Sequence, residues 1–308
     1  MGSEKQEQNY DMLILGAGPA GLTAAIYASR AGLSALVCEE KLSGGEISAT
    51  EQLDNFPGFP EGINGIEFGM RLEQQAQRFG TRIVSASIET VELDGEWKRV
   101  VTTAGEFLGR TVVIATGTQP RNLGVPGEEK LRGRGISYCA TCDGPFFRDK
   151  MVAVIGGGDS AVEEALYLTR FAGGVLLVHR RDMLRAVPYL QEKLLNHPNV
   201  KVLWDTVVKG FAGEAKLEKI LVQNVRNDSM AEVPVDGAFL YVGRIPNSSF
   251  FNGVEKDANG YIITNDEMET KIPGVYAVGD IRRKFLRQVV TAAADGAIAA
   301  MVAVRYLA

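Results

Sequence analysis

The sequence predicts an α/β protein built from two Rossmann-like dinucleotide-binding domains. Two glycine-rich turns, at residues 16–21 and 156–161, each follow a short apolar run and precede a segment of helical composition. A second apolar run closes each unit about 30 residues after it begins, which is the usual size of a β-α-β unit. A length of 308 residues is sufficient for two domains, each with its own core.

The first unit consists of a strand at residues 10–15, a helix at 20–30 and a second strand at 33–38. Its turn, Gly16-Ala17-Gly18-Pro19-Ala20-Gly21, has glycine where the chain turns tightly, where a pyrophosphate approaches the backbone and where helix and strand pack. The start of the helix offers free N–H groups to phosphates. Glu39 ends the second strand, where a carboxylate can accept hydrogen bonds from ribose hydroxyls. Together these features predict a dinucleotide site.

The second unit repeats this pattern with a strand at 152–155, a helix at 161–171 and a strand at 175–178. Its turn, Gly156-Gly157-Gly158-Asp159-Ser160-Ala161, ends in alanine, which is a permitted variant of the motif.

Basic residues follow the second strand of this unit in place of an acid. His179-Arg180-Arg181 ends the strand and Arg185 comes four residues later. Guanidinium groups bind a phosphate dianion through charge-assisted hydrogen bonds, so this site is expected to prefer NADPH over NADH. The alternative is a solvated basic turn beside a helix.

The rest of the chain holds connectors and further strands. Residues 83–101 alternate like a strand, and 110–116 form a buried strand that ends at Gly117. Proline and glycine mark connectors at 120–127 and 243–247. The remaining strands are predicted at 201–204, 219–226 and 275–278, the last of which leads through Gly279-Asp280 into a long helix. This tail is too short for a third nucleotide unit, so we expect it to fold back onto one of the first two.

A paired-cysteine motif, Cys139-Ala140-Thr141-Cys142, lies just before the second glycine turn. Structural zinc needs four ligands, but the chain has no second CxxC and only two histidines. Two inert buried thiols remain possible, and a redox dithiol is favoured because close thiols stabilise one thiolate. Asp143 can then carry protons to or from a thiol. Cys38, on a predicted buried strand, is expected to be a small apolar filler.

Composition excludes several classes of function. Hydrophobic residues make up 45% of the chain, charged residues 23%, and the net charge is −5, which gives no footprint for nucleic acid. The polar segment 1–11 lacks the apolar core of a signal peptide, and no uninterrupted apolar run reaches the roughly 18 to 20 residues of a membrane span. The alanine-rich run 291–304 contains Asp295 and is predicted to be a buried helix. Three cysteines without a secretion signal favour a reducing compartment, so we expect a cytoplasmic protein.

These motifs resemble the low-molecular-weight, bacterial-type thioredoxin reductases, and the resemblance extends over residues 10–307. The matching segments are 16–21, 44–45 with 55–58, 115–117, 139–143, 156–161, 179–181 with Arg185, Gly243 with 246–247, and 279–280 with 287–288. The position of the cysteine motif between the two nucleotide units is specific to this family.

The resemblance implies that the first unit binds FAD and the second binds NADPH. It implies a discontinuous FAD-binding domain at residues 9–119 and 248–308, with the NADPH-binding domain at 120–247 inserted and carrying the CxxC motif. Electrons would pass from NADPH through FAD and the Cys139–Cys142 dithiol to thioredoxin. The family is homodimeric and swings one domain between flavin reduction and delivery of electrons by the dithiol.

The turns and the resemblance together give the expected site residues. In catalysis, Cys142 would be the thiol nearer the flavin, Cys139 would attack the partner's disulfide, and Asp143 would be the acid or base. The residues expected to contact FAD are Gly16, Gly18, Pro19, Ala20, Gly21, Glu39, Gly45, Asn55, Thr116, Gly117, Gly279, Asp280, Arg287 and Gln288. Those expected to contact NADPH are Gly156, Gly158, Asp159, Ser160, Ala161, His179, Arg180, Arg181 and Arg185. We expect no metal site.

Two positions depart from the family pattern. Glu46 replaces the glutamine that commonly lies beside the flavin, and Pro145 replaces the first of two aromatic residues after Asp-Gly. Two other functions stay open at this point: a dithiol oxidase that uses oxygen, and an electron carrier or redox sensor without turnover. The arginine cluster counts against the oxidase, because an oxidase has no need to bind NADPH.

Overall fold

A computed structural model describes residues 8–50 and 52–308 of the chain. Residues 1–7, part of the segment in which the sequence predicts no signal peptide, lie outside the described residues. The chain divides into two compact units. Unit 1 comprises residues 1–119 and 245–308, and unit 2 comprises residues 120–244.

Unit 1 contains a seven-stranded sheet in its described residues, in the order β3-β2-β1-β6-β5-β4 with β17 also on β6. Its strands are β1 (Gln8–Leu15), β2 (Ala35–Glu39), β3 (Arg82–Ser85), β4 (Ile88–Glu92), β5 (Lys98–Thr102), β6 (Gly105–Ile114) and β17 (Val275–Ala277). Its helices are α1 (Pro19–Arg30), α2 (Gly65–Arg78) and α7 (Val289–Leu307), with short 3-10 turns η1 (Gly45–Ala49) and η3 (Gly279–Ile281). Strands β1, β2, β3, β6 and β17 run parallel, whereas β4 and β5 are antiparallel.

The long strand β6 joins the two ends of the chain. Its first half pairs with β5, and its second half pairs with β17 through Val112, Val113 and Ile114. Strand β1 pairs along the other edge of β6. The C-terminal segment thus completes the first sheet, and the prediction that the tail folds back is confirmed.

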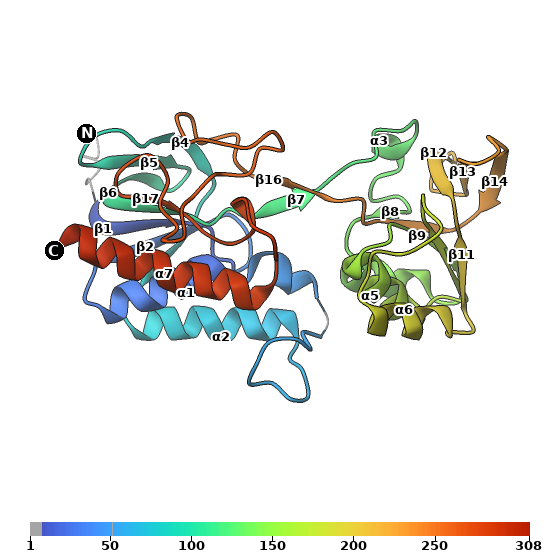
Figure 1. The fold of residues 1–308 in the computed structure, drawn as a ribbon, viewed down its shortest axis with the longest axis horizontal. Helices are drawn as coiled ribbons and strands as arrows, with labels where there is room; N and C mark the ends of the chain where they lie inside the picture. The colour runs from blue at the N-terminus through green and yellow to red at the C-terminus, as the bar shows by residue number, and fades with distance from the viewer. Residues whose placement is uncertain (1–7, 51) are drawn as a thin grey trace. The chain divides into compact units, whose positions relative to one another are not determined.

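Both faces of this sheet are buried. In β1, Met12 and Ile14 pack into one apolar cluster while Leu13 and Leu15 pack into another. A parallel sheet covered on both sides has such an unbroken apolar run, because successive side chains point to opposite faces. Helices α1, α2 and α7 lie side by side on one face (Figure 1).

Unit 2 contains a five-stranded parallel sheet in the order β11-β10-β9-β15-β8 and a three-stranded antiparallel sheet in the order β12-β13-β14. The strands are β8 (Ile136–Ser137), β9 (Met151–Ile155), β10 (Gly174–Val178), β11 (Val200–Leu203), β12 (Thr206–Ala212), β13 (Lys219–Asn224), β14 (Met230–Pro234) and β15 (Gly237–Leu240). The helical segments are α3 (Glu128–Leu131), α4 (Ala140–Asp143), η2 (Gly144–Phe147), α5 (Asp159–Leu168) and α6 (Pro188–Leu195). The predicted α/β class with two Rossmann-like domains is confirmed.

The two connecting segments pair with each other as the short strands β7 (Thr118–Pro120) and β16 (Arg244–Pro246). The Asn247 N–H donates to the Gly117 carbonyl at 3.0 Å, and the Arg121 N–H donates to the Gly243 carbonyl at 3.0 Å. Gly117 and Gly243 have φ angles of 60° and 116°, which glycine adopts without the cost that a side chain would add.

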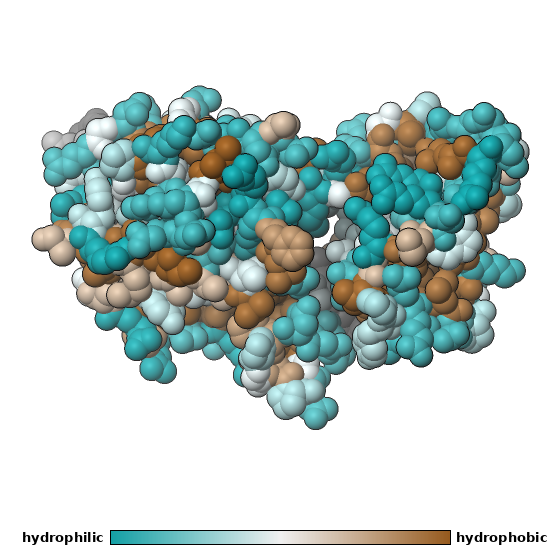
Figure 2. Space-filling model, viewed as in Figure 1, coloured by the Kyte–Doolittle hydropathy of each residue, from teal (hydrophilic) through white to brown (hydrophobic). Residues whose placement is uncertain are grey.

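Helix α7 is the one helix among the described residues that is long and apolar enough to cross a membrane by length and composition. A core helix meets the same criterion, and α7 packs on α1 with Ala299, Ala300 and Ala303 fully buried. In the view of Figure 2, hydrophilic residues cover most of the visible face and hydrophobic residues form smaller patches between them.

Close packing of α1 and α7 depends on Gly296. A Cβ atom at this position would overlap the carbonyl oxygen of Ala20. Gly296→Ala is therefore expected to destabilise the protein by about 1–3 kcal/mol through overpacking, although alanine favours a helix interior by about 1 kcal/mol. Denaturant unfolding measures the change, with the exposed Ile298→Ala as control. Equal or higher stability of Gly296→Ala would show that the two helices are not in close contact.

Candidate redox and nucleotide-binding sites

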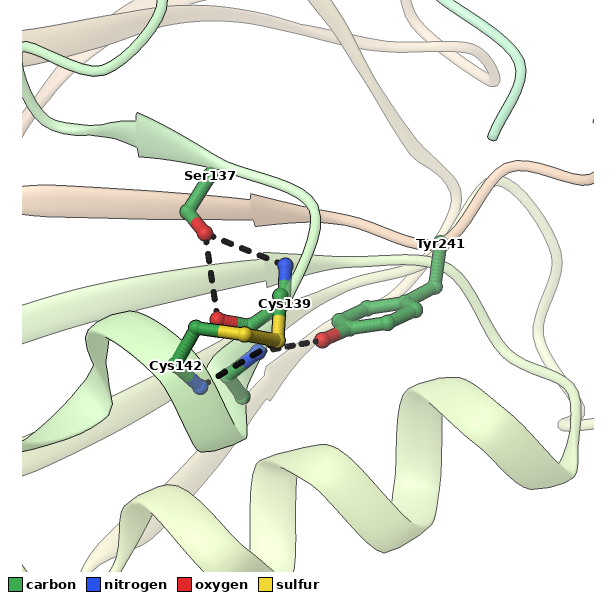
Figure 3. Close-up of a disulfide and its surroundings, with 5 residues drawn as sticks. Ser137, Cys139, Cys142 and Tyr241 are labelled. Atoms are coloured by element: carbon green, nitrogen blue, oxygen red, sulfur yellow. Dashed lines mark hydrogen bonds between the residues drawn. A yellow bond between two sulfur atoms is a disulfide. The ribbon is translucent and has the colours of Figure 1, made fainter. Parts of the chain in front are cut away.

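The paired cysteines form a disulfide at the start of α4 (Figure 3). The two sulfur atoms lie 2.07 Å apart and the two Cα atoms 5.4 Å apart. The Cys142 N–H donates to Cys139 Sγ at 3.2 Å, so the first helical turn brings the two residues together. The two cysteines are thus paired with each other, and among the described residues no group of three His, Cys, Asp or Glu side chains could hold a metal ion.

Two polar side chains hold the backbone of this motif (Figure 3). Ser137 Oγ accepts the Cys139 N–H at 3.1 Å and donates to the Cys139 carbonyl at 3.2 Å. The Tyr241 hydroxyl accepts the Ala140 N–H at 3.0 Å. Burial raises the pKa of Tyr241 well above its usual value, so its hydroxyl stays neutral. The sequence analysis missed both residues, because neither belongs to a motif.

The remaining site residues of this motif differ in exposure. Cys139 is half-buried and Cys142 is exposed, while Asp143 is half-buried at the end of α4. Cys38 lies at the end of β2 and is 2% exposed, and burial raises the pKa of its thiol to about 12. A thiol with this pKa is inert at neutral pH, which agrees with the expected role as an apolar filler.

The first glycine turn connects β1 to α1 with the geometry that a pyrophosphate needs. A Cβ atom at Gly16 would lie 2.5 Å from the Ala115 carbonyl oxygen, whereas one at Gly18 would meet nothing within 4 Å. Glycine is therefore required for packing at the first position and leaves open space at the second. No side chain caps the start of α1, so its N–H groups point to that open space.

The carboxylate at the end of β2 lies beside this turn. Glu39 Oε2 accepts the Ala17 N–H at 2.7 Å, and Oε1 accepts the Lys41 N–H at 2.9 Å. Gly44 donates its N–H to the Ala17 carbonyl at 2.7 Å, and a Cβ atom at Gly45 would lie 3.2 Å from Gly18 Cα. Glu39 and Gly45 therefore lie next to the turn.

Residues from both ends of unit 1 meet at the same edge of the sheet. Asn55 Nδ2 donates to Gln288 Oε1 at 3.1 Å, although 233 positions separate them. A Cβ atom at Gly279 would lie 2.9 Å from Ala20 Cβ. Thr116 Oγ1 donates to the Asn247 carbonyl at 3.0 Å. Ligands of open α/β sheets bind at the carboxyl ends of the strands, which is where these residues lie.

The side chain of Arg287 has a buried hydrogen-bond donor that fits a bound group. Its guanidinium stacks on the ring of Tyr261 at 4.1 Å, and its Nε is buried without a hydrogen-bond acceptor in the described part of the chain. Buried donors in native proteins are nearly always paired, so a bound group with an acceptor atom fits here. The open turn and this donor together fit an FAD in unit 1.

The second glycine turn connects β9 to α5. The Arg185 N–H donates to the Gly157 carbonyl at 2.7 Å, and the Val187 N–H donates to Asp159 Oδ1 at 2.8 Å. The segment that carries Arg185 is thus fixed against the turn. Arg180, Arg181 and Arg185 are exposed, and they form no ion pair within the described residues. Three uncompensated guanidinium groups beside a glycine turn fit a phosphorylated ribose.

The ring of His179 lies behind this turn and is 5% exposed. Its Nδ1 is 2.9 Å from the Gly156 carbonyl oxygen and its Nε2 is 3.0 Å from the Met183 carbonyl oxygen. The structure therefore shows His179 in contact with the backbone of the turn. Burial lowers the pKa of its imidazole, more than the two carbonyl contacts raise it.

A family model described as pyridine nucleotide-disulphide oxidoreductase matches residues 10–296. The chain is 46% identical to the thioredoxin reductase of Bacillus subtilis (strain 168) over 305 residues, which cover 98% of this chain and 96% of that protein. It is 42% identical to the thioredoxin reductase of Treponema pallidum (strain Nichols) over 301 residues, which cover 98% of each. The crystal structure of Lactococcus lactis thioredoxin reductase in the FR conformation matches with a TM-score of 0.94 at 42% identity, covering 97% of this chain and 99% of that chain.

The chain therefore belongs to the pyridine nucleotide-disulphide oxidoreductases. Within this family it belongs to the bacterial-type thioredoxin reductases, as the sequence motifs predicted.

A buried neutral His179 makes stability depend on pH. The unfolded chain has an ordinary histidine pKa of about 6.5, and the folded value is lower, so protons bind preferentially to the unfolded state between the two values. Stability is fully present above about pH 6.5 and falls as the pH drops toward the folded pKa. We expect His179→Asn to reduce this slope in melting curves between about pH 7.5 and 5.5, and the control His197→Asn to retain it. An unchanged slope in His179→Asn would contradict the burial argument.

Proposed function

We propose that this protein is an NADPH-dependent thioredoxin reductase with FAD bound to unit 1 and NADPH bound to unit 2. The observation that carries the proposal is the Cys139–Cys142 disulfide in a chain with two dinucleotide turns. FAD, when bound, accepts a hydride equivalent from NADPH and supplies two electrons to a disulfide. The assignment of FAD to residues 9–119 and 248–308 and of NADPH to residues 120–247 is part of the proposal.

The chain's own chemistry centres on the disulfide. Two electrons and two protons convert Cys139 and Cys142 to a dithiol. The Cys139 thiolate then attacks a disulfide sulfur of thioredoxin, which forms a mixed disulfide and releases one partner thiolate. The Cys142 thiolate attacks Cys139 Sγ, which restores the disulfide and releases reduced thioredoxin. Asp143, directly after Cys142, would transfer the protons.

Polar contacts orient this motif for the exchange. Ser137 and Tyr241 hydrogen-bond to the backbone of Cys139 and Ala140, which supports the start of α4 while the disulfide opens and closes. Phe146, three residues after Asp143, is 72% exposed, whereas Phe147 packs edge-on against Phe239 at 5.4 Å between ring centroids. With Pro145 in place of an aromatic residue, Phe146 is an exposed apolar side chain, four residues after Cys142, that a docked partner would contact.

A pair of cysteine variants tests the roles of the two thiols. Cys142→Ser is expected to retain FAD and its reduction by NADPH but to lose thioredoxin turnover. It should trap a thioredoxin adduct on Cys139, whereas Cys139→Ser should trap none. Mass spectrometry of the adduct identifies the cysteine, and both variants keep Cys38 as an internal control. An adduct on Cys142 would reverse the assignment, and near-normal turnover by Cys142→Ser would refute the relay.

Neutral substitutions at the arginine cluster test the nucleotide preference. Each charge-assisted hydrogen bond contributes about 1.5–3 kcal/mol, so Arg180→Gln with Arg181→Gln should weaken NADPH binding at least about a hundredfold. NADH has no 2′-phosphate and should bind nearly as before. Titration of both nucleotides measures the ratio, with the exposed pair Lys209→Gln and Lys216→Gln as control. Equal losses for NADPH and NADH would contradict the assignment.

The proposal includes a homodimer in the cytoplasm. Exposed apolar side chains lie on α7 at Val290, Ile298, Met301 and Tyr306, with exposures of 39% to 48%. An apolar helix with an uncovered side is typical of a surface that a second copy covers. Light scattering should give the mass of a dimer, and Met301→Glu should shift it toward the monomer by placing a charge in the contact. A monomeric wild type, or a dimer unaffected by Met301→Glu, would reject this interface.

A further inference from the structure

Asp295 is an acid buried in the middle of the alanine-rich helix α7. It is 5% exposed, and it faces the side of α7 that packs in unit 1. A buried carboxylate is costly unless hydrogen bonds and opposite charges compensate it. The contacts of Asp295 therefore show what the chain uses it for.

Three groups from one loop bind this carboxylate. Oδ2 accepts the Gly279 N–H at 2.9 Å, Arg282 Nε at 2.9 Å and Lys284 Nζ at 2.9 Å. Oδ1 accepts a second hydrogen bond from Arg282 at 3.1 Å. The side chains of Arg282 and Lys284 are only 15% and 6% exposed, so these ion pairs are shielded from water.

These contacts hold the loop between β17 and α7, residues 279–288. Asp295 binds Gly279 at the start of the loop and Arg282 and Lys284 in its middle. The helix that carries Asp295 begins directly after Gln288, where the loop ends. The loop tip has little apolar anchoring, because Phe285 is fully exposed and Leu286 is 46% exposed. The loop carries Gly279, Asp280, Arg287 and Gln288, all expected to contact FAD.

The buried group also carries an unbalanced charge. Arg282 and Lys284 contribute two positive charges and Asp295 one negative charge, so the cluster has a net charge of +1. The start of α7 at Gln288 adds the positive end of a helix dipole to the same loop. Positive charge near a flavin favours the reduced form, which is more negative than the oxidised one.

We propose that Asp295, with Arg282 and Lys284, is a positioning group that holds the flavin-binding loop, and that its net positive charge makes the bound flavin easier to reduce. This proposal rests on the FAD site of the proposed function. It predicts that removing a positive charge and removing the negative charge shift the flavin reduction potential in opposite directions. A purely structural cluster makes no such prediction.

The test is dye-equilibrated anaerobic reduction of the FAD-loaded enzyme, with the FAD dissociation constant measured in parallel. Lys284→Met keeps the length of the side chain and removes a positive charge, so it should lower the flavin potential. A tenfold change in the reduction equilibrium corresponds to about 30 mV for a two-electron couple. Asp295→Asn should raise the potential while weakening FAD binding, because the loop loses its charged anchor.

Lys271→Met is the matched control, since Lys271 is exposed and pairs with Glu255 at the surface of unit 1. It should change neither the potential nor the binding of FAD. Potentials of Lys284→Met and Asp295→Asn that equal that of the control, or that shift in the same direction, would overturn the proposal. If Asp295→Asn does not fold, the direction in which Lys284→Met shifts the flavin potential decides the proposal alone. A wild type that binds no FAD would instead refute the proposed function.

Discussion

Pairing of β17 with β6 is the constraint on which the candidate flavin site depends. Strand β6 receives β1 along one edge and β17 along the other, so the first and last strands of unit 1 are two positions apart in one sheet. Their carboxyl ends lie at the same edge, because all three strands are parallel. This pairing brings Gly279 against Ala20 and Gln288 against Asn55. The long insertion that forms unit 2 leaves from this sheet and returns to it without interrupting it.

A second constraint is the small size of the side chains between α1 and α7. A Cβ atom at Gly296 would overlap the Ala20 carbonyl oxygen. The absence of a side chain there lets α7 lie close to α1, which holds the start of α7, and therefore Gln288, near the glycine turn. Asp295 then fixes the loop from the other side through its contacts with Gly279, Arg282 and Lys284. The close packing of α1 and α7 and the buried carboxylate of Asp295 thus both position the loop that contains Gly279 and Gln288.

The sequence predicted the parts of the fold that local pattern determines. The two β-α-β units, the glycine turns and the returning tail follow from short apolar runs and turn residues, and strand β13 falls within the predicted segment 219–226. Strand β6 begins at Gly105 instead of 110, because its first half pairs with β5 in an antiparallel hairpin and contains two glycines and Glu106, which interrupt the apolar run. The sequence pattern predicts no strand at β12 or β14, because neither is an uninterrupted apolar run.

Within the sites, the sequence predicted the residues that belong to motifs and missed those that support them. Ser137, Tyr241 and Asp295 act through contacts with residues far along the chain or with backbone groups, and no spacing rule marks such contacts. For His179, a motif residue, the predicted contact and the observed contacts are different ones. Its place in a basic motif predicted a cofactor contact, and the structure shows its ring against the carbonyl groups of Gly156 and Met183. Whether it also contacts a nucleotide stays a prediction.

The proposed function requires that electrons from NADPH arrive at the Cys139–Cys142 disulfide. Anaerobic addition of NADPH to the FAD-loaded enzyme, followed by alkylation and peptide mass spectrometry, measures this directly without any protein partner. We expect NADPH to reduce Cys139 and Cys142 together, so that both thiols are alkylated, while Cys38 remains unlabelled in the folded protein before and after reduction. Reduction of the flavin with the disulfide left intact would contradict the proposed function.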